Sequence, residues 1–322
     1  MTPPTLAPRT IAPGADLVGA GLIAVAAACF ATLGPISRYA EAAGVGALTL
    51  VTWRAALGAV TVGALVAGQR LAGLGTVRAL RNIPRRQLLL MGAAALANCT
   101  LNLAVFIAFL RISIALALLL FYLYPAYVAL ASVLLFGERL DRPRWLALGL
   151  SLVGTVLVVA GAGGIADGTD PLGVFLAVIA GMAQMVFVLL VRHGFNAVPG
   201  PQAAMLTTGG AALVYLAVSL VVGASALVAP LASADALRLV LLAGTIGAGV
   251  PTTAYLLGIR RLGAPRAAIL ATLEPVLGVT LAALLLGEQP TVLQLVGGAL
   301  ILVAAVLLQV RGDAAAAHEA AD

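Results

Sequence analysis

Long apolar runs alternate with short polar connections along nearly the whole chain. Each run is about 20 residues long, the length that an α-helix needs to cross a hydrocarbon core roughly 30 Å thick. The pattern predicts ten membrane-spanning helices, at about 17–38, 46–68, 87–110, 112–136, 145–163, 172–192, 203–224, 237–259, 264–286 and 291–310. Little more than Arg111 separates the third run from the fourth, so we expect a tight hairpin there.

The composition supports a membrane protein. The chain is 62% hydrophobic and 9% charged, with a mean hydropathy of +1.13. Soluble globular domains are roughly 45–50% apolar and about 25% charged, so the soluble class is excluded and the lipid bilayer is the predicted surrounding. The pI of about 10.0 raises nucleic acid as a partner. The basic residues do not gather on one face, however, and we predict no nucleic-acid binding.

The arginines predict the orientation. All 18 basic side chains are arginine, which we attribute to codon usage in a GC-rich bacterial genome. Ten spans place both termini on one side. With that side inside, the inner segments contain Arg9, Arg70, Arg78, Arg81, Arg85, Arg86, Arg139, Arg142, Arg144, Arg192, Arg260, Arg261, Arg266 and Arg311, and the outer segments Arg38, Arg111 and Arg238. The positive-inside rule therefore predicts a multi-pass protein of the bacterial inner (plasma) membrane with both termini cytoplasmic.

One stretch of the chain occurs twice. LYPAYVALASVLLFGERL at 123–140 corresponds to LEPVLGVTLAALLLGEQP at 273–290, and the proline and the Gly-Glu pair recur at an offset of 150 residues. Each half contains five spans, an odd number. The two halves, as copies of one unit, must therefore have opposite orientations in the membrane. The fold class predicted is all-α integral membrane, with ten transmembrane helices as two inverted five-helix repeats, an arrangement typical of secondary transporters. The expected units are a disordered cytoplasmic tail (1–16), a first repeat (17–163), a periplasmic linker (164–171), a second repeat (172–310) and a cytoplasmic tail (311–322).

Pro125 and Pro275 are predicted hinges. A proline costs roughly 3 kcal/mol in a helix interior, and it removes the partner of a carbonyl one turn earlier, here Phe121 and Ala271. Such a carbonyl needs a neighbouring helix, water or substrate as a partner in hydrocarbon. The alternative is a packing kink without motion.

Glu274 and Arg54 are the charged residues predicted to lie inside the membrane. Glu274 lies about eight residues from the inner end of its span, roughly 12 Å deep, and buried ionisable groups usually face a polar cavity or a partner. It suits a proton relay or an ammonium ligand, whereas the Arg54 guanidinium suits a carboxylate or phosphate. A static structural pairing, including one between these two residues, is left open.

Several uncharged polar residues are further candidates for lining a cavity. They are Tyr122, Tyr124, Asn98, Asn102, Gln184 and Tyr255. Tyr124 corresponds to Glu274 in the repeat, so the predicted site is asymmetric. Hydrogen bonding between helices is an equally common use of such side chains.

The ends of the repeated helices have recognisable signals. Gly137 and Gly287 suit helix C-termini, so Glu138 and Glu288 are interpreted first as part of a stop and turn. Asp141 and Thr291 are expected N-caps of the following spans, and Thr291 with Gln294 forms a capping-box pattern.

The sequence lacks the signals of catalysis and of cofactors. It contains no G-x-x-x-x-G-K-[ST] phosphate loop, and neither His193 nor His318 has neighbours spaced as metal ligands. No serine–histidine arrangement suggests a nucleophile. We therefore predict no enzyme activity, no cofactor and no metal.

The ten spans, the arginine within WRAALGAV at 53–60 and the repeated P-x11-G-E together resemble the EamA-type transporters of the drug/metabolite transporter superfamily. The resemblance covers nearly the whole chain. It implies a proton-coupled or facilitative carrier, usually an exporter of amino acids or other small metabolites, with a central cavity shared by both halves.

The predicted function is a secondary transporter that exports small metabolites, chiefly amino acids or related compounds, by alternating access. Its partners are a small-molecule substrate and the bilayer, and proton coupling and a homodimer are left open. The alternatives are a multidrug or cation exporter and a non-transporting membrane scaffold.

Overall fold

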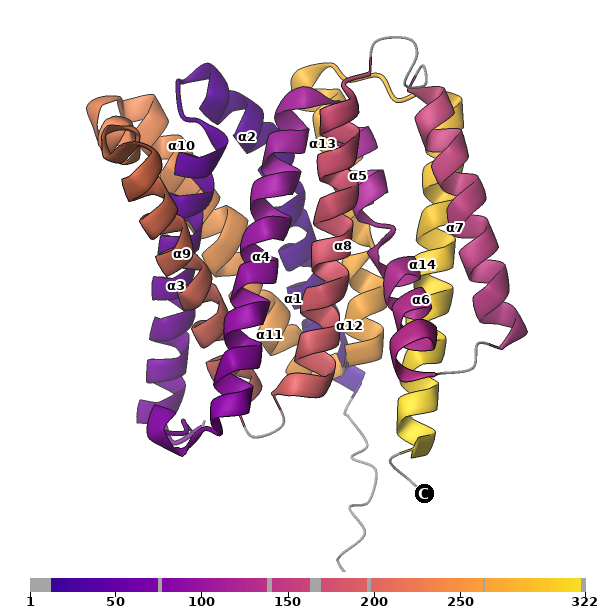
Figure 1. The fold of residues 1–322 in the computed structure, drawn as a ribbon, viewed down its shortest axis with the longest axis horizontal. Helices are drawn as coiled ribbons and strands as arrows, with labels where there is room; N and C mark the ends of the chain where they lie inside the picture. Colours follow the sequence, from indigo (N-terminus) through magenta and orange to yellow (C-terminus); the bar gives the residue numbers. More distant parts are fainter. Residues whose placement is uncertain are drawn as a thin grey trace, which may run out of the picture.

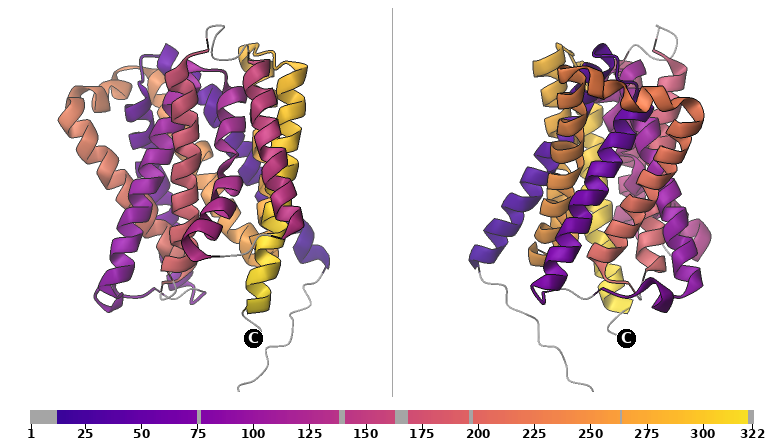
Figure 2. Two further views of the ribbon diagram at one scale, coloured as in Figure 1. Left: turned by 45° about the vertical axis from the view of Figure 1, so that its right-hand side comes forward. Right: turned by 90° about the vertical axis from the view of Figure 1, so that its left-hand side faces the viewer.

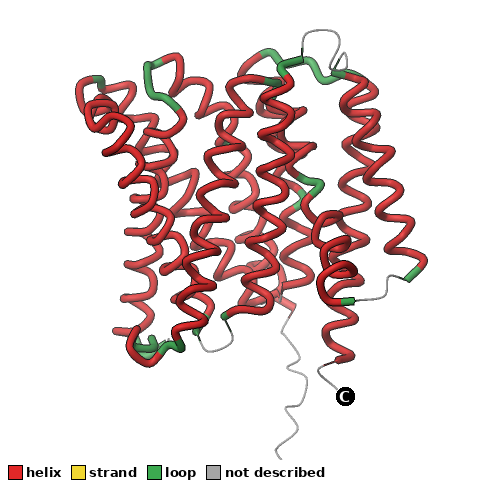
Figure 3. Tube along the Cα trace, viewed as in Figure 1, coloured by secondary structure: helices red, strands yellow, loops and turns green. Residues whose placement is uncertain are grey.

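The computed structural model describes residues 13–74, 77–137, 141–162, 169–195, 198–262 and 264–319. The helices of the first half are α1 (Pro13–Ala31), α2 (Leu33–Ala42), α3 (Ala47–Leu71), α4 (Arg85–Arg111), α5 (Ile114–Phe121), α6 (Tyr124–Phe136) and α7 (Arg142–Gly161). Those of the second half are α8 (Pro171–Gly194), α9 (Gly200–Val228), α10 (Ala234–Gly244), α11 (Val250–Leu262), α12 (Ala264–Ala271), α13 (Leu273–Leu286) and α14 (Val292–Glu319). Two 3-10 turns, Leu80–Asn82 and Ala229–Ala232, complete the described elements, with a π-helical segment at Thr245–Gly249 (Figures 1 and 3).

The described helices confirm a multi-pass membrane protein. Nine segments are long and apolar enough to cross a membrane, and a shorter apolar helix follows at Val292–Leu308. The tenth predicted run corresponds to this shorter helix, so the described residues confirm nine spans and the tenth stays a prediction. Large apolar side chains on the outer surface fit a lipid environment. Leu134 and Leu284, which correspond in the repeat, are 73% and 76% exposed.

Helices of one half pack mainly against helices of the other. The principal pairs are α7 with α14, α4 with α8, α1 with α11 and α3 with α9. When each helix is replaced by its counterpart in the other repeat, the same set of pairs is obtained. This symmetry fits a two-repeat architecture. The start of α1 and the end of α14 lie at the same end of the bundle in all views, and we call it the terminal end (Figures 1 and 2). The opposite end is the distal end.

The predicted interruptions lie where the prolines place them. The fourth run divides into α5 and α6 at Tyr122–Leu123, and the ninth divides into α12 and α13 at Thr272. Pro125 and Pro275 each lie in the first turn of the second piece, where a missing N–H costs little. Gly137 and Gly287 end these helices with φ of +67° and +69°, the left-handed conformation expected of a glycine C-cap.

Some boundaries differ from the sequence prediction. The helix α1 begins at Pro13, inside the segment expected to be a tail, and proline is well tolerated in a first turn. The helix α14 continues to Glu319, because the alanines at 314–317 favour helix beyond the apolar run. A break at Thr32 separates α1 from α2. Pro35 lies in the first turn of α2, as Pro275 does in α13, so the sequence contained a signal that the prediction missed. The expected linker was 164–171, and its residues 164–168 lie outside the described part of the chain, as do residues 1–12 and Glu138.

Candidate substrate-binding site

A central cavity of about 740 Å³ lies between the two halves of the bundle. Helices α1, α3, α4 and α5 of the first half and α8, α9, α11 and α13 of the second contribute to its wall. The structure brings all eight predicted site residues to this one cavity: Arg54, Asn98, Asn102, Tyr122, Tyr124, Gln184, Tyr255 and Glu274. Residues far apart in the sequence therefore share one space.

The cavity extends toward the terminal end. Its lining includes Phe195, Val198 and Gly200, which lie where α8 connects to α9 at that end. Toward the distal end its lining finishes with Leu33 and Gly34 of α2 and Leu118 of α5. The central cavity thus extends toward the terminal end and is closed toward the distal end.

Arg54 is held from two sides. Its Nε donates to the Gly247 carbonyl at 3.1 Å and its Nη1 to Asn102 Oδ1 at 2.5 Å, while its Cζ lies 5.6 Å from the Phe106 ring centre. Within the described chain the remaining nitrogen, Nη2, has no hydrogen-bond partner, so it is available to a ligand in the cavity. A guanidinium fixed in this way presents a directed donor.

The two partners of Arg54 have structural explanations. Gly247 belongs to the π-helical segment Thr245–Gly249, and π turns depart from the regular α-helical hydrogen-bond ladder. Asn102 is itself fixed, because its Nδ2 donates to the Asn98 side chain at 2.6 Å and to the Asn98 carbonyl at 2.9 Å. The predicted pair on one face of α4 therefore orients the arginine.

Glu274 lies in the first turn of α13 and also lines the cavity. The Tyr122 side chain lies beside its carboxylate, and the positive charge of Arg54 attracts this carboxylate. The described ion pairs do not include a direct contact between Arg54 and Glu274. The two charges consequently face the cavity separately and leave space between them for a solute.

The two helix breaks meet beside Glu274. The Tyr122 hydroxyl, from the first break, donates to the Ala271 carbonyl of the second at 3.5 Å. The Phe121 carbonyl lies against Gly181 of α8, where an added Cβ would be 3.1 Å away. Both carbonyls that the prolines were expected to free thus face another part of the protein. The rings of Phe121, Tyr122 and Tyr124 pack together at centre distances of 5.4–6.0 Å.

Sequence reasoning missed the aromatic wall. Phe30, Phe106, Phe121 and Phe187 line the cavity among the polar groups. A signal was present for one of them, because Phe106 continues the helical face of Asn98 and Asn102 at intervals of four residues. Thr252 lines the cavity beside Tyr255, whereas the Thr253 hydroxyl is buried without a hydrogen-bond partner in the described chain.

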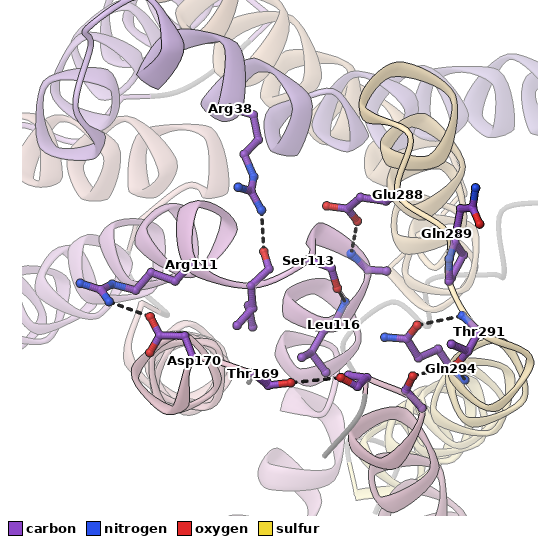
Figure 4. Close-up of a pocket in the computed structure, with 15 residues that line it drawn as sticks. Arg38, Arg111, Ser113, Leu116, Thr169, Asp170, Glu288, Gln289, Thr291 and Gln294 are labelled. Carbon is purple, nitrogen blue, oxygen red and sulfur yellow. Dashed lines mark hydrogen bonds and ion pairs between the residues drawn. The ribbon is translucent and has the colours of Figure 1, made fainter. Parts of the chain in front are cut away.

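A second pocket of about 550 Å³ lies at the distal end (Figure 4). Arg38 Nη2 donates to the Ile112 carbonyl at 2.8 Å. The Ile114 and Ala115 N–H groups donate to the two Glu288 carboxylate oxygens at 2.9 and 3.3 Å. Glu288 therefore caps the N-terminus of α5. The sequence had suggested only that it is part of the stop and turn after α13.

Capping interactions surround this distal pocket. Thr291 Oγ1 accepts from the Gln294 N–H and Gln294 Oε1 accepts from the Thr291 N–H, which confirms the predicted capping box. Asp141, at the other end of the molecule, caps α7 as expected.

Arg111 and Asp170 form an ion pair at 2.7 Å, and the hydrogen bond from Arg111 lowers the pKa of Asp170.

The chain is similar to known transporters. The sequence model of the EamA-like transporter family matches residues 17–160 and again 171–310. An uncharacterized transporter of Synechocystis sp. is 29% identical over 66% of this chain and 65% of its own length, just under two thirds. An uncharacterized transporter of Archaeoglobus fulgidus is 27% identical over 69% of this chain and 77% of its own. A solved crystal structure with 22% identity has a TM-score of 0.61 over 91% of this chain and 96% of that one, and supports the fold alone.

Proposed function

Because the chain belongs to the EamA-like transporter family, we propose that it is a secondary carrier that exports small zwitterionic metabolites, above all amino acids, across the bacterial inner membrane by alternating access. The observation that carries the substrate class is the placement of Arg54 and Glu274 in one cavity without a direct ion pair between them. A solute with a carboxylate and an ammonium group complements both charges.

Each part of the cavity has a role in this proposal. The available Nη2 of Arg54 donates to the substrate carboxylate, and Glu274 accepts from the ammonium group. Side chains such as Phe30, Phe106 and Phe187 provide an apolar surface for the rest of the solute. The volume of about 740 Å³ is in the range of small-molecule sites, roughly 300–1,000 Å³.

The arginine distribution supports a cytoplasmic terminal end and ten spans with both termini inside. In that orientation the cavity extends toward the cytoplasm, which fits loading of the substrate for export. Motion at the breaks before Pro125 and Pro275 opens the other side. Glu274 couples this cycle to protons, because a carboxylate can bind a proton or an ammonium group but not both together.

A second candidate is the export of lipophilic cations. The aromatic residues around Glu274, namely Phe121, Tyr122 and Tyr124, favour it, because aromatic faces and a carboxylate together attract organic cations. In that case Glu274 is the exchange site and Arg54 a positioning residue. A non-transporting scaffold has no support in the family.

The test is transport by purified protein in proteoliposomes under an imposed pH gradient. A panel of radiolabelled amino acids is compared with a cationic dye, using counterflow against internal unlabelled solute. We expect exchange of at least one amino acid above protein-free liposomes. Glu274→Gln should lower this exchange about tenfold or more, equivalent to roughly 1.4 kcal/mol or more of lost interaction.

Glu41→Gln is the matched control, because Glu41 is an exposed carboxylate on α2 away from the cavity, and its exchange should equal that of the unaltered protein. Equal exchange by Glu274→Gln contradicts the assigned site. Transport of the dye without any amino acid selects the cation exporter instead.

A further inference from the structure

Only a thin barrier separates the central cavity from the distal pocket. On α5, Ala115 and Leu116 line the distal pocket, and Leu118 lines the central cavity. On α2, Arg38 lines the distal pocket, and Gly34 lines the central cavity. The same two helices are therefore walls of both spaces, and about one helical turn lies between them.

The barrier is closely packed. Ile114, Leu116 and Leu118 are at most 6% exposed. A Cβ added to Gly34 would lie 2.8 Å from Ile114, and one added to Gly278 of α13 would lie 2.5 Å from Leu118. No solute passes between α2, α5 and α13 in this arrangement, so α5 has to move away before the two spaces can join.

Polar contacts fix the distal end of α5. Glu288 accepts from the first two N–H groups of the helix, with both carboxylate oxygens engaged. Arg38 binds the preceding Ile112 carbonyl. The negative charge of Glu288 also complements the positive end of the α5 dipole, so these contacts are charge-assisted.

Helix α13 connects this contact to the central cavity. It carries Glu274 in its first turn and is followed by Gly287 and Glu288, whose N–H bonds back to the Ala282 carbonyl at 3.3 Å. At the opposite end of α5, the Tyr122 hydroxyl donates to the Ala271 carbonyl at the break before α13, and its ring lies beside Glu274. Helices α5 and α13 are thus joined at both ends, once in each space.

We propose that Glu288 is the gate residue that keeps the distal side of the transport path closed by holding the N-terminus of α5 against α13. The distal pocket is then the outer end of that path. Opening releases the Ile114 and Ala115 N–H groups from Glu288 as α13 turns about the break at Thr272. This inference rests on the proposed carrier function, but its test needs no substrate.

The experiment measures the accessibility of single cysteines to a membrane-impermeant maleimide, added to either side of sealed vesicles. Cys29 and Cys99 are first replaced by alanine. Thr252→Cys reports on the central cavity, and Gln289→Cys marks the distal side. With Glu288→Gln, labelling of Thr252→Cys from the distal side should become roughly tenfold faster, as expected for the loss of charge assistance from two hydrogen bonds. Labelling from the terminal side should become slower, because the two openings alternate.

Three controls make the result decisive. Glu41→Gln, which removes an exposed carboxylate from the same end, should leave both rates unchanged. Labelling of Gln289→Cys should not respond to Glu288→Gln. Glu288→Asp keeps the charge on a shorter side chain, and should shift both rates in the same directions by a smaller factor.

Unchanged rates in both Glu288 variants overturn the proposal. Faster labelling from both sides also overturns it, because that result indicates loss of packing rather than gating. Failure of the amino-acid transport assay leaves this measurement intact, so the two proposals fail separately.

Discussion

Arg54 shows why the kind of cation matters at a buried site. Its guanidinium bonds a carbonyl of the second half and an asparagine of the first half through two different nitrogens. The planar fork allows both bonds while a third nitrogen remains available. A lysine ammonium is a single point charge on a flexible stem, and cannot reproduce this arrangement.

Arg54→Lys should therefore reduce transport although it conserves the charge. We expect kcat/KM in counterflow to fall about tenfold or more, equivalent to roughly 1.4 kcal/mol or more. Arg238→Lys is the control, because Arg238 is 75% exposed and pairs with Asp235 at the surface. Similar kinetics for the two variants would show that Arg54 contributes charge alone.

Close backbone contact distinguishes the α7–α14 pair among the helices. A Cβ added to Gly297 would lie 2.5 Å from the Gly154 carbonyl oxygen, and one added to Gly154 would lie 2.6 Å from the Gly297 oxygen. Glycines at such contacts let two membrane helices approach closely and gain van der Waals packing. Thr291 reinforces the contact by donating to the Gly161 carbonyl at 3.0 Å.

Gly297→Ala should push these helices apart. Overpacking against backbone atoms is expected to lower the free energy of unfolding by about 1–3 kcal/mol, measured as a lower midpoint of thermal unfolding in detergent. Gly149→Ala is the matched control on α7, where an added Cβ meets nothing within 4 Å. That variant should be neutral or stabilised by up to about 1 kcal/mol, because alanine favours helix over glycine. An equal loss in both variants would contradict the packing explanation.

The whole molecule combines a symmetric packing scheme with an asymmetric site. Exchange of the two halves leaves the principal helix pairs unchanged. The corresponding positions in the two breaks nevertheless carry Tyr124 and Glu274, so only one break brings a charge to the cavity. Of the glutamates in the two Gly-Glu pairs, Glu288 belongs to the described residues and Glu138 does not. Glu288 caps α5 at the distal end.

The orientation can be tested on the complete chain in intact cells. In a background without Cys29 and Cys99, a membrane-impermeant maleimide should label Gln289→Cys at the distal end. It should not label Ala72→Cys in the exposed connection after α3 at the terminal end. The reason is the arginine excess of the terminal end, which the positive-inside rule places in the cytoplasm. The reverse pattern would mean that the chain is inserted the other way round.

The sequence by itself determined the features that depend on local chemistry. Apolar runs predicted the spans, prolines the two interruptions, and Gly287, Asp141 and Thr291 the ends of helices. Each follows from the conformational preference of one residue or from the composition of one segment. The set of candidate cavity residues was also predictable, because polar groups are few in so apolar a chain.

Only the tertiary structure decided which of these groups meet. Arg54 and Gly247 are 193 positions apart, and Ile114 and Glu288 are 174 apart. Neither contact follows from local preference, because each needs two helices from different halves at one depth. The π-helical segment and the aromatic wall were likewise missed, and the wall combines phenylalanines of α1, α4, α5 and α8 that meet only in the folded chain. A repeat in sequence indicates two similar halves, but their contact surface is a property of the folded chain.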